Sequence, residues 1–339
     1  MIAPFGLRHI QLLRQLQGAC AQLDPNGALE EPASALRLAL RGYFLGPRTG
    51  VQTYILRSSD HAQSQCGFAQ TRAQAPQIPL VKTSLPAWRV VAMAPLLDAS
   101  EDAATIWYRL LLHLCIAAGE RGVTRLFACL PERSAAEDVF RQATFVTYSH
   151  QQTYWRENSE GLGHPSSAAR QAVAEDALNV LRLWHKVTPR TVQQAEEPGN
   201  SRAATGSSEV ATTNAERHYV LYSTTQQLQG LLSVSTGPRG VRLRLIVDSD
   251  ARGAAARVLD HGLAAIEDHS RPVFCTVREY QGGLRALLED RGFAPGETCS
   301  LLVKHTTVRV REPLRKLVPA LEQGVEVTPS VSHSEPAEG

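Results

Sequence analysis

Two stretches of this chain show the same succession of hydrophobic patterns: an apolar strand, a long helix, a second strand and a short helix that ends in an aromatic residue. The first stretch runs from Trp88 to Phe145 and the second from Val241 to Phe293. β-branched apolar runs predict the strands, and apolar residues three or four apart predict the helices. The predicted elements are 88–96, 101–119, 123–130 and 134–143 in the first copy, and 241–247, 251–268, 272–277 and 282–291 in the second. A unit that occurs twice predicts two similar domains.

Further elements flank each copy. The pattern predicts a helix at 4–17, strands at 51–57 and 65–72, and a hairpin or long edge strand at 145–156. Around the second copy it predicts a helix at 172–186, a hairpin of 218–223 and 230–236, and a closing strand at 300–310. The fold class is therefore α/β (α+β), with two mixed, twisted sheets that are flanked by helices.

Composition sets the expected domain limits. The first domain covers 1–156, a linker covers 157–171, and the second domain covers 172–312. Few apolar residues occur at about 195–216 or at 323–339, so these segments are expected to be a disordered loop and a disordered tail.

This order of elements resembles the GNAT superfamily, the acetyl-CoA-dependent N-acetyltransferases, in tandem. In that family a strand ends in a loop of the form Arg/Gln-x-x-Gly-x-Gly/Ala, which opens the next helix and holds the CoA pyrophosphate on backbone N–H groups. The segment VDSDARGAAARVL (247–259) matches this loop in the second copy. Set by the helix, the register places Gly253 and Ala255 on the Gly-x-Gly/Ala pair; set by the strand, it places Arg252 and Gly253 on the family's Arg-Gly.

The resemblance implies cofactor-binding residues only in the second copy, namely Val247, Arg252, Gly253, Ala254 and Ala255. An alternative is that these small residues only allow the helix start to pack closely. The corresponding loop of the first copy, APLLDASEDAATIW (94–107), has no glycine and carries Asp98, Glu101 and Asp102. Acidic residues stabilise a helix N-terminus and repel a phosphate, so we interpret the first copy as degenerate.

The tyrosine with which many family members protonate the leaving thiolate is replaced by Leu288 in the second copy and by Phe140 in the first. Neither side chain can donate a proton. Tyr280, just after the strand at 272–277, is the candidate substitute, with simple packing as the alternative. Asp248 is the candidate catalytic base or amine-binding group, with helix capping as the alternative.

The net charge and the cysteine pattern limit the classes of binding partner and the cellular setting that we expect. A formal net charge of +2 predicts neither nucleic-acid nor membrane binding. Arginines interrupt the apolar pattern of residues 1–20, which argues against a secretory signal. The six cysteines form no CxxC pair and the histidines no ligand spacing, so we expect a reduced, cytoplasmic protein without a metal.

The resemblance implies an acetyl-CoA-dependent N-acetyltransferase that acts on a small-molecule or protein amine, and it leaves a homodimer open. The alternative is a catalytically silent acyl-CoA-binding or protein-interaction module that retains the fold. The discriminating feature is the spacing of strands 241–247 and 272–277. A splayed gap favours cofactor binding, and a closed one favours the silent module.

Overall fold

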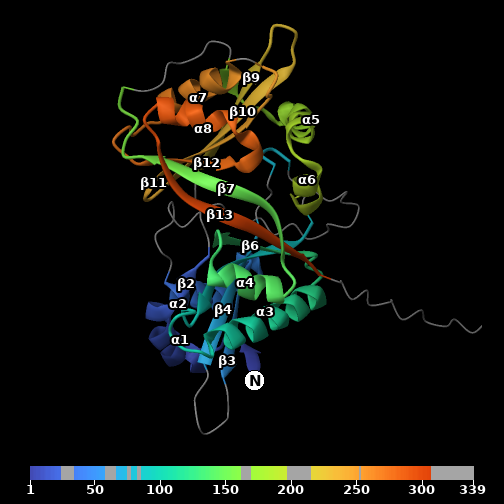
Figure 1. Ribbon diagram of the computed structural model, residues 1–339, viewed down its shortest axis with the longest axis vertical. Helices are drawn as coiled ribbons and strands as arrows, with labels where there is room; N and C mark the ends of the chain where they lie inside the picture. Colours follow the sequence, from blue (N-terminus) through green and yellow to red (C-terminus); the bar gives the residue numbers. More distant parts are fainter. Residues whose placement is uncertain are drawn as a thin grey trace, which may run out of the picture. The chain divides into compact units, whose positions relative to one another are not determined.

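In the part of the chain that the structure describes, strands from both halves join into one mixed sheet of 13 strands, flanked by helices (Figure 1). The computed structural model describes residues 1–23, 34–57, 66–74, 78–81, 85–161, 169–196, 215–251 and 253–306. The sheet order is β1-β3-β4-β5-β6-β13-β7-β12-β11-β10-β9-β8, and β2 pairs with β5. The α/β fold class is confirmed.

The elements of the first half are β1 (Ile2–Pro4), η1 (Leu7–His9), α1 (Ile10–Leu16), η2 (Gln17–Ala19), β2 (Ala21–Gln22), α2 (Ala35–Leu45), η4 (Gly46–Thr49), β3 (Val51–Arg57), β4 (Cys66–Ala73), β5 (Ala87–Ala94), α3 (Ala103–Glu120), β6 (Arg125–Pro131), α4 (Ala135–Gln142) and β7 (Val146–Arg156). Those of the second half are β8 (Ala169–Gln171), η5 (Ala174–Asp176), α5 (Ala177–Val187), α6 (Arg190–Glu196), β9 (Ala215–Tyr222), β10 (Leu228–Gly237), β11 (Gly240–Val247), α7 (Ala254–Ala264), β12 (Val273–Arg278), η6 (Glu279–Gln281), α8 (Gly283–Asp290) and β13 (Ala294–His305). Apart from the short strands β1, β2 and β8 and the 3₁₀ turns, the described part of each half runs through two α-helices, three strands, a helix, a strand, a helix and a final strand. The sequence pattern predicts this order except for α2 and α6, which it missed.

The final strands of the two halves are exchanged. β13 lies between β6 and β7 and is antiparallel to both, and β7 in turn pairs with β12 (Figure 1). The prediction that 145–156 is a hairpin or an edge strand was therefore wrong, because both neighbours of β7 come from the second half. The domain limits at 156 and 172 stay a prediction.

Several boundaries differ from the sequence prediction, among them the starts of α5 at Ala177 and of α7 at Ala254. β13 begins at Ala294 rather than at 300, and its pairing with β7 shifts between Pro295 and Thr298. Proline and glycine interrupt a strand pattern and commonly accompany such bulges, which explains why the sequence hid this start. At the N-terminus, the helix predicted at 4–17 is a short strand and a 3₁₀ turn before α1 begins at Ile10.

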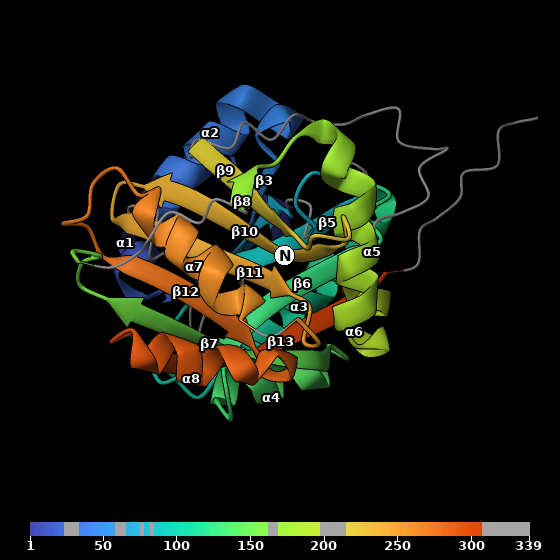
Figure 2. The same ribbon diagram turned by 90° about the horizontal axis from the view of Figure 1, so that it is seen from above.

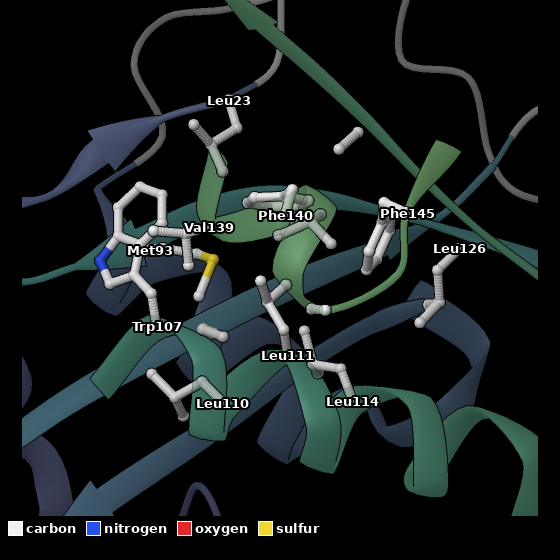
Figure 3. Close-up of a cluster of buried hydrophobic side chains, with 14 of the residues drawn as sticks. Leu23, Met93, Trp107, Leu110, Leu111, Leu114, Leu126, Val139, Phe140 and Phe145 are labelled. Atoms are coloured by element: carbon white, nitrogen blue, oxygen red, sulfur yellow. The ribbon is translucent and has the colours of Figure 1, made fainter. Parts of the chain in front are cut away.

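Each half has its own core on the face that carries the helix after the central strand. In the first half, Leu111 of α3 points towards Phe140 of α4, and Leu110, Leu114 and Val139 belong to the same buried cluster (Figure 3). The second core holds Leu243 and Leu245 of β11 against Val258 and Leu259 of α7. Figure 2 shows α7 lying along β10 and β11.

The opposite face of the second half is covered by α5 together with a loop of the first half. Trp184 and Val180 of α5 pack with Ile246 of β11, and Ile78, from the loop between β4 and β5, joins the same cluster. The first half therefore supplies side chains as well as a strand to the second.

Asp176 joins β8, β9 and the start of α5. Its carboxylate accepts two hydrogen bonds from Arg170, at 2.8 and 2.7 Å, one from the Tyr222 hydroxyl at 2.6 Å and one from the backbone N–H of Val173 at 2.9 Å. The Arg170 hydrogen bonds, chiefly, lower the pKa of Asp176 to about 2. These bonds stabilise the charged form of the carboxylate.

We expect the Asp176→Asn variant to be less stable than the wild type at pH 7 and to approach it as the pH falls. The pKa of Asp176 is lower in the folded chain than the value of about 3.9 in an unfolded one. The stabilisation that the charged Asp176 carboxylate gives the folded chain is therefore present above about pH 4 and is lost as the pH falls towards 2. Urea unfolding at pH 7, 4 and 2 measures this, with the exposed Asp138→Asn as control. A stability difference that does not change with pH would contradict the assignment.

Candidate active site

The parallel strands β11 and β12 diverge towards their carboxyl ends. They pair at three positions, Val241 with Val273, Arg242 with Phe274 and Leu243 with Cys275. Within the described residues no pairing joins them beyond that point, although β11 continues to Val247 and β12 to Arg278. A gap of this kind exposes backbone groups in the middle of a sheet, where a ligand can satisfy them.

Backbone groups of β11 face this gap. The Leu245 carbonyl accepts a hydrogen bond from Gln281 Nε2 at 2.8 Å, from beyond the end of β12. The N–H of Asp248 turns the other way and donates to Gln229 at 2.9 Å. Because backbone groups alternate in direction along a strand, the N–H of Val247 points to the same side as the Leu245 carbonyl, towards the gap.

Small residues form the start of α7, directly after β11. Gly253 caps the helix in the left-handed conformation, with φ of 71°, and none of the described atoms lies within 4 Å of the place where a Cβ would be. Ala254 is buried against the core and Ala255 is half-buried. Arg252, the remaining residue of the predicted cofactor loop, lies outside the described residues. The Ala254 N–H already donates to the Ala251 carbonyl at 3.1 Å. Since the first N–H groups of a helix have no partner within it, those of Gly253 and Ala255 are the donors that this start can offer to an anion.

The two aspartates of the loop are paired with a lysine of α5. Lys186 Nζ lies 2.8 Å from each carboxylate oxygen of Asp248 and 3.0 Å from Asp250 Oδ2. Asp248 also accepts the N–H of Asp250 at 3.2 Å. The Asp248 hydrogen bond, above all, raises the pKa of Lys186. These contacts reduce the repulsion that the aspartates exert on a phosphate. They give Asp248 a structural role in the loop, but this role is not helix capping, because Gly253 is the N-cap residue of α7.

Tyr280 lies in η6, immediately beyond β12. Burial raises the pKa of its hydroxyl, while the nearby Arg278 lowers it. The hydroxyl therefore keeps its proton at neutral pH and can donate it. Leu288 and Phe140, which stand where the family has its tyrosine, are both fully buried in the two cores.

A buried ion pair lies on the other face of β12 from α7. Arg278 Nη2 is 2.7 Å from Glu196 Oε1 at the end of α6, and the Tyr148 hydroxyl of β7 donates to the same oxygen at 2.8 Å. Burial raises the pKa of Glu196, but the charges of Arg278 and Arg244 outweigh it, so that this pKa lies below its usual value. Burial lowers the pKa of Arg244, and the negative charge of Glu196 acts in the opposite direction by raising this pKa.

Sequence reasoning missed this ion pair. Glu196 falls in the segment that composition marked as a disordered loop, yet it ends α6. A signal was present in the strand VRLRLIV, because Arg242 and Arg244 alternate with residues of the core. Arginines at alternate positions of a central strand indicate that the second face meets polar groups.

The first half repeats the divergence but closes it differently. β5 and β6 pair only from Ala87 with Arg125 to Arg89 with Phe127. Trp107 of α3 donates a hydrogen bond to the Pro95 carbonyl at 2.7 Å and is buried beside the loop. Asp98, Glu101 and Asp102 lie in this loop, where their charges disfavour a phosphate. Asp102 is the N-cap residue of α3, but its side chain makes no capping hydrogen bond.

A cavity of about 290 Å³ lies where β6, β7, β12 and β13 meet. Its lining includes Phe274, Trp155, Cys129 and Cys299. A hydrogen bond from Cys129, above all, lowers the pKa of Cys299. Phe274 belongs to the paired part of β12, so the cavity lies apart from the gap between β11 and β12.

A mixed sheet whose two central parallel strands part before a helix is what the resemblance to GNAT proteins predicts, and the chain has the GNAT fold. It is similar to a tandem GNAT protein from the clavulanic acid biosynthesis pathway, at a TM-score of 0.52 and 15% identity over 90% of this chain and 98% of that one. A GCN5-related N-acetyltransferase from Sphaerobacter thermophilus has a TM-score of 0.49, with 11% identity over 90% and 95%. One from Kribbella flavida has 0.45, with 13% identity over 91% and 71%.

At these identities the likeness concerns the fold alone. No family model matches the sequence, and no curated protein matches it. Among the described helices, none combines the length and the apolar character that crossing a bilayer requires. The described residues contain no cluster of three or more His, Cys, Asp or Glu suited to a metal ion.

Proposed function

We propose that the protein is an acetyl-CoA-dependent N-acetyltransferase whose second half binds the cofactor. The observation that carries this proposal is the divergence of β11 and β12 directly before the glycine-capped start of α7. In the proposal the acceptor is a small-molecule or protein amine, and six free cysteines fit a reduced cytoplasmic setting.

In the proposed reaction, the N–H groups around Gly253 and Ala255 hold the pyrophosphate. The family resemblance, and not the structure, assigns Arg252 to the same role. The N–H of Val247 points into the gap and polarises the thioester carbonyl, which the neutral amine attacks. The C–S bond then breaks, and Tyr280 donates its proton to the leaving thiolate. The proton of the amine goes to water, since Lys186 occupies both oxygens of Asp248.

A silent acyl-CoA-binding or protein-interaction module is the second candidate. The observation in its favour is the hydrogen bond from Gln281 to the Leu245 carbonyl, which bridges the open part of the gap. Because Gln281 already satisfies the Leu245 carbonyl, this backbone group no longer needs a hydrogen-bond donor from a cofactor.

Isothermal titration of acetyl-CoA into the full chain tests the proposal. We expect micromolar binding by the wild type and a loss of about tenfold or more in Gly253→Glu, because the new carboxylate lies at the pyrophosphate. Gly253→Ala is the control, since it carries the same backbone strain without the charge. Gly282→Glu adds the same carboxylate at the start of α8, where the structure has room for it.

Absence of binding by the wild type would remove the transferase proposal. Equal losses in Gly253→Glu and Gly253→Ala would trace the effect to backbone strain and contradict the placement of the pyrophosphate. Binding without acetyl transfer to any amine would favour the silent module.

A further inference from the structure

The guanidinium of Arg278 uses only part of its hydrogen-bonding capacity. Nη2 is paired with Glu196, whereas Nη1 is buried and has no acceptor among the residues that the structure describes. The Tyr148 hydroxyl donates its proton to Glu196, and its oxygen does not accept a hydrogen bond from Nη1. A buried charged donor without a partner is costly, so an unmatched guanidinium nitrogen indicates a missing anionic or carbonyl oxygen.

The position of Arg278 places that oxygen next to the reacting groups. Arg278 is the last residue of β12, beyond the point where β11 separates from it, and Tyr280 follows two residues later. Its side chain retains 14% exposure, so it lies at the edge of the protein interior. The charge of Arg278 acts on the pKa of Tyr280, so the two side chains are near each other and a ligand that reaches the guanidinium comes close to the Tyr280 hydroxyl.

The face of the sheet distinguishes two sources of an anionic oxygen. α7 packs on the face of β11 that carries Leu243 and Leu245, and its start would hold the CoA phosphates. Arg278 points to the opposite face, where it meets α6 through Glu196. Since the phosphates and Arg278 lie on opposite faces, the oxygen belongs to the acceptor and not to the cofactor.

Glu196 holds the guanidinium in place without occupying it. The carboxylate pairs with Nη2 and is itself fixed by the Tyr148 hydroxyl, so the planar fork of Arg278 is oriented with one nitrogen available. An arginine oriented in this way binds a carboxylate through a charge-assisted hydrogen bond of defined geometry.

We propose that the acceptor is an amine that also carries a carboxylate, as an amino acid does, and that Arg278 Nη1 binds this carboxylate while the amine faces the thioester. The inference rests on the proposed acetyltransferase activity. It names the class of acceptor, and it assigns Arg278 to substrate binding with Glu196 as its positioning residue.

Matched acceptors test the inference on the full chain. The panel is the twenty L-amino acids and their carboxamides, with acetyl transfer followed by the release of free CoA thiol. Direct binding of the same compounds is measured by calorimetry without cofactor. For the accepted amino acid, kcat/KM for the acid is expected to exceed that for its amide by about tenfold or more, the value of one charge-assisted hydrogen bond.

Variants separate binding from folding. Arg278→Gln alone leaves Glu196 buried without its partner, so the double variant Glu196→Gln with Arg278→Gln is the main test, because it replaces the charged pair by a neutral one. In the double variant, the ratio of kcat/KM for the acid to kcat/KM for the amide is expected to be about twofold or less, and the affinity for acetyl-CoA is expected to be unchanged. Arg285→Gln, at an exposed position of α8, is the matched control and keeps the preference.

The inference is overturned if amides serve as well as acids, if the preference survives the double variant, or if neither transfer nor binding is detected with any acid. A loss of acetyl-CoA affinity in the double variant would assign Arg278 to a cofactor phosphate instead. Failure of the proposed function is distinguishable, because acetyl-CoA would then not bind the wild type, whatever the acids do.

Discussion

Replacing Glu196 with glutamine is expected to lower the free energy of unfolding by about 3–5 kcal/mol, because it leaves the charge of Arg278 buried without its partner. The side chain of Glu196 is 2% exposed, so water cannot take over the role of the carboxylate. The same substitution also weakens the acceptor for the Tyr148 hydroxyl. Urea unfolding, followed by circular dichroism at pH 7, measures the change.

Glu267→Gln is the matched control for this substitution. Glu267 pairs with Arg217 at the same distance of 2.7 Å, but its side chain is 80% exposed. Exposed ion pairs contribute about 0–1 kcal/mol, so this variant is expected to change little. If Glu196→Gln and Glu267→Gln lower the free energy of unfolding by the same small amount, the ion pair of Glu196 and Arg278 is not as buried as the structure shows. Adding Arg278→Gln to Glu196→Gln is expected to restore part of the loss.

A chain that ends after Phe293 is expected to lose the fold of both halves. The deletion removes β13, which pairs with β6 along Cys299–His305 and with β7 along most of its length. It also removes Leu302, a fully buried member of the core between α3 and α4, although that core otherwise belongs to the first half. Hydrogen exchange of the amides in α3 measures the effect in the half from which nothing was deleted.

Deleting 323–339 is the control for this truncation, because the sequence predicts these residues to be unstructured. We expect the shorter deletion to leave the exchange of α3 unchanged. If α3 stays protected in the chain that ends after Phe293, the first half folds without the exchanged strand. The contribution of β13 would then be confined to the second half.

Elements with strong local patterns were predictable from the sequence. The apolar run of β5, the helical spacing of α3 and the strand at 51–57 lie within about two residues of their expected limits, because each element buries one continuous apolar surface. The GNAT fold followed from their order. The exchange of β7 and β13 did not, since pairing partners distant in the sequence leave no local signal.

The site was predictable in part, and for the same reason. Glycine at 253 and alanine at 254 and 255 marked a helix start that the structure places directly behind the diverging strands. The pairing of Lys186 with Asp248 and that of Arg278 with Glu196 join residues more than sixty positions apart, so spacing along the chain does not indicate them. Whether Tyr280 acts as the acid stays a prediction.

Because each half supplies a strand to the other, the first half is needed for the fold of the second even if it binds no ligand. If the two halves arose from one ancestral unit, two separate copies of that unit would have completed each other as a pair of subunits, and fusion would have made the pairing permanent. From then on the first copy could lose its phosphate loop to acidic residues without being lost itself. The first copy still contributes β7 and Ile78 to the structure of the second, and neither contribution requires the first copy to bind a phosphate or to catalyse a reaction.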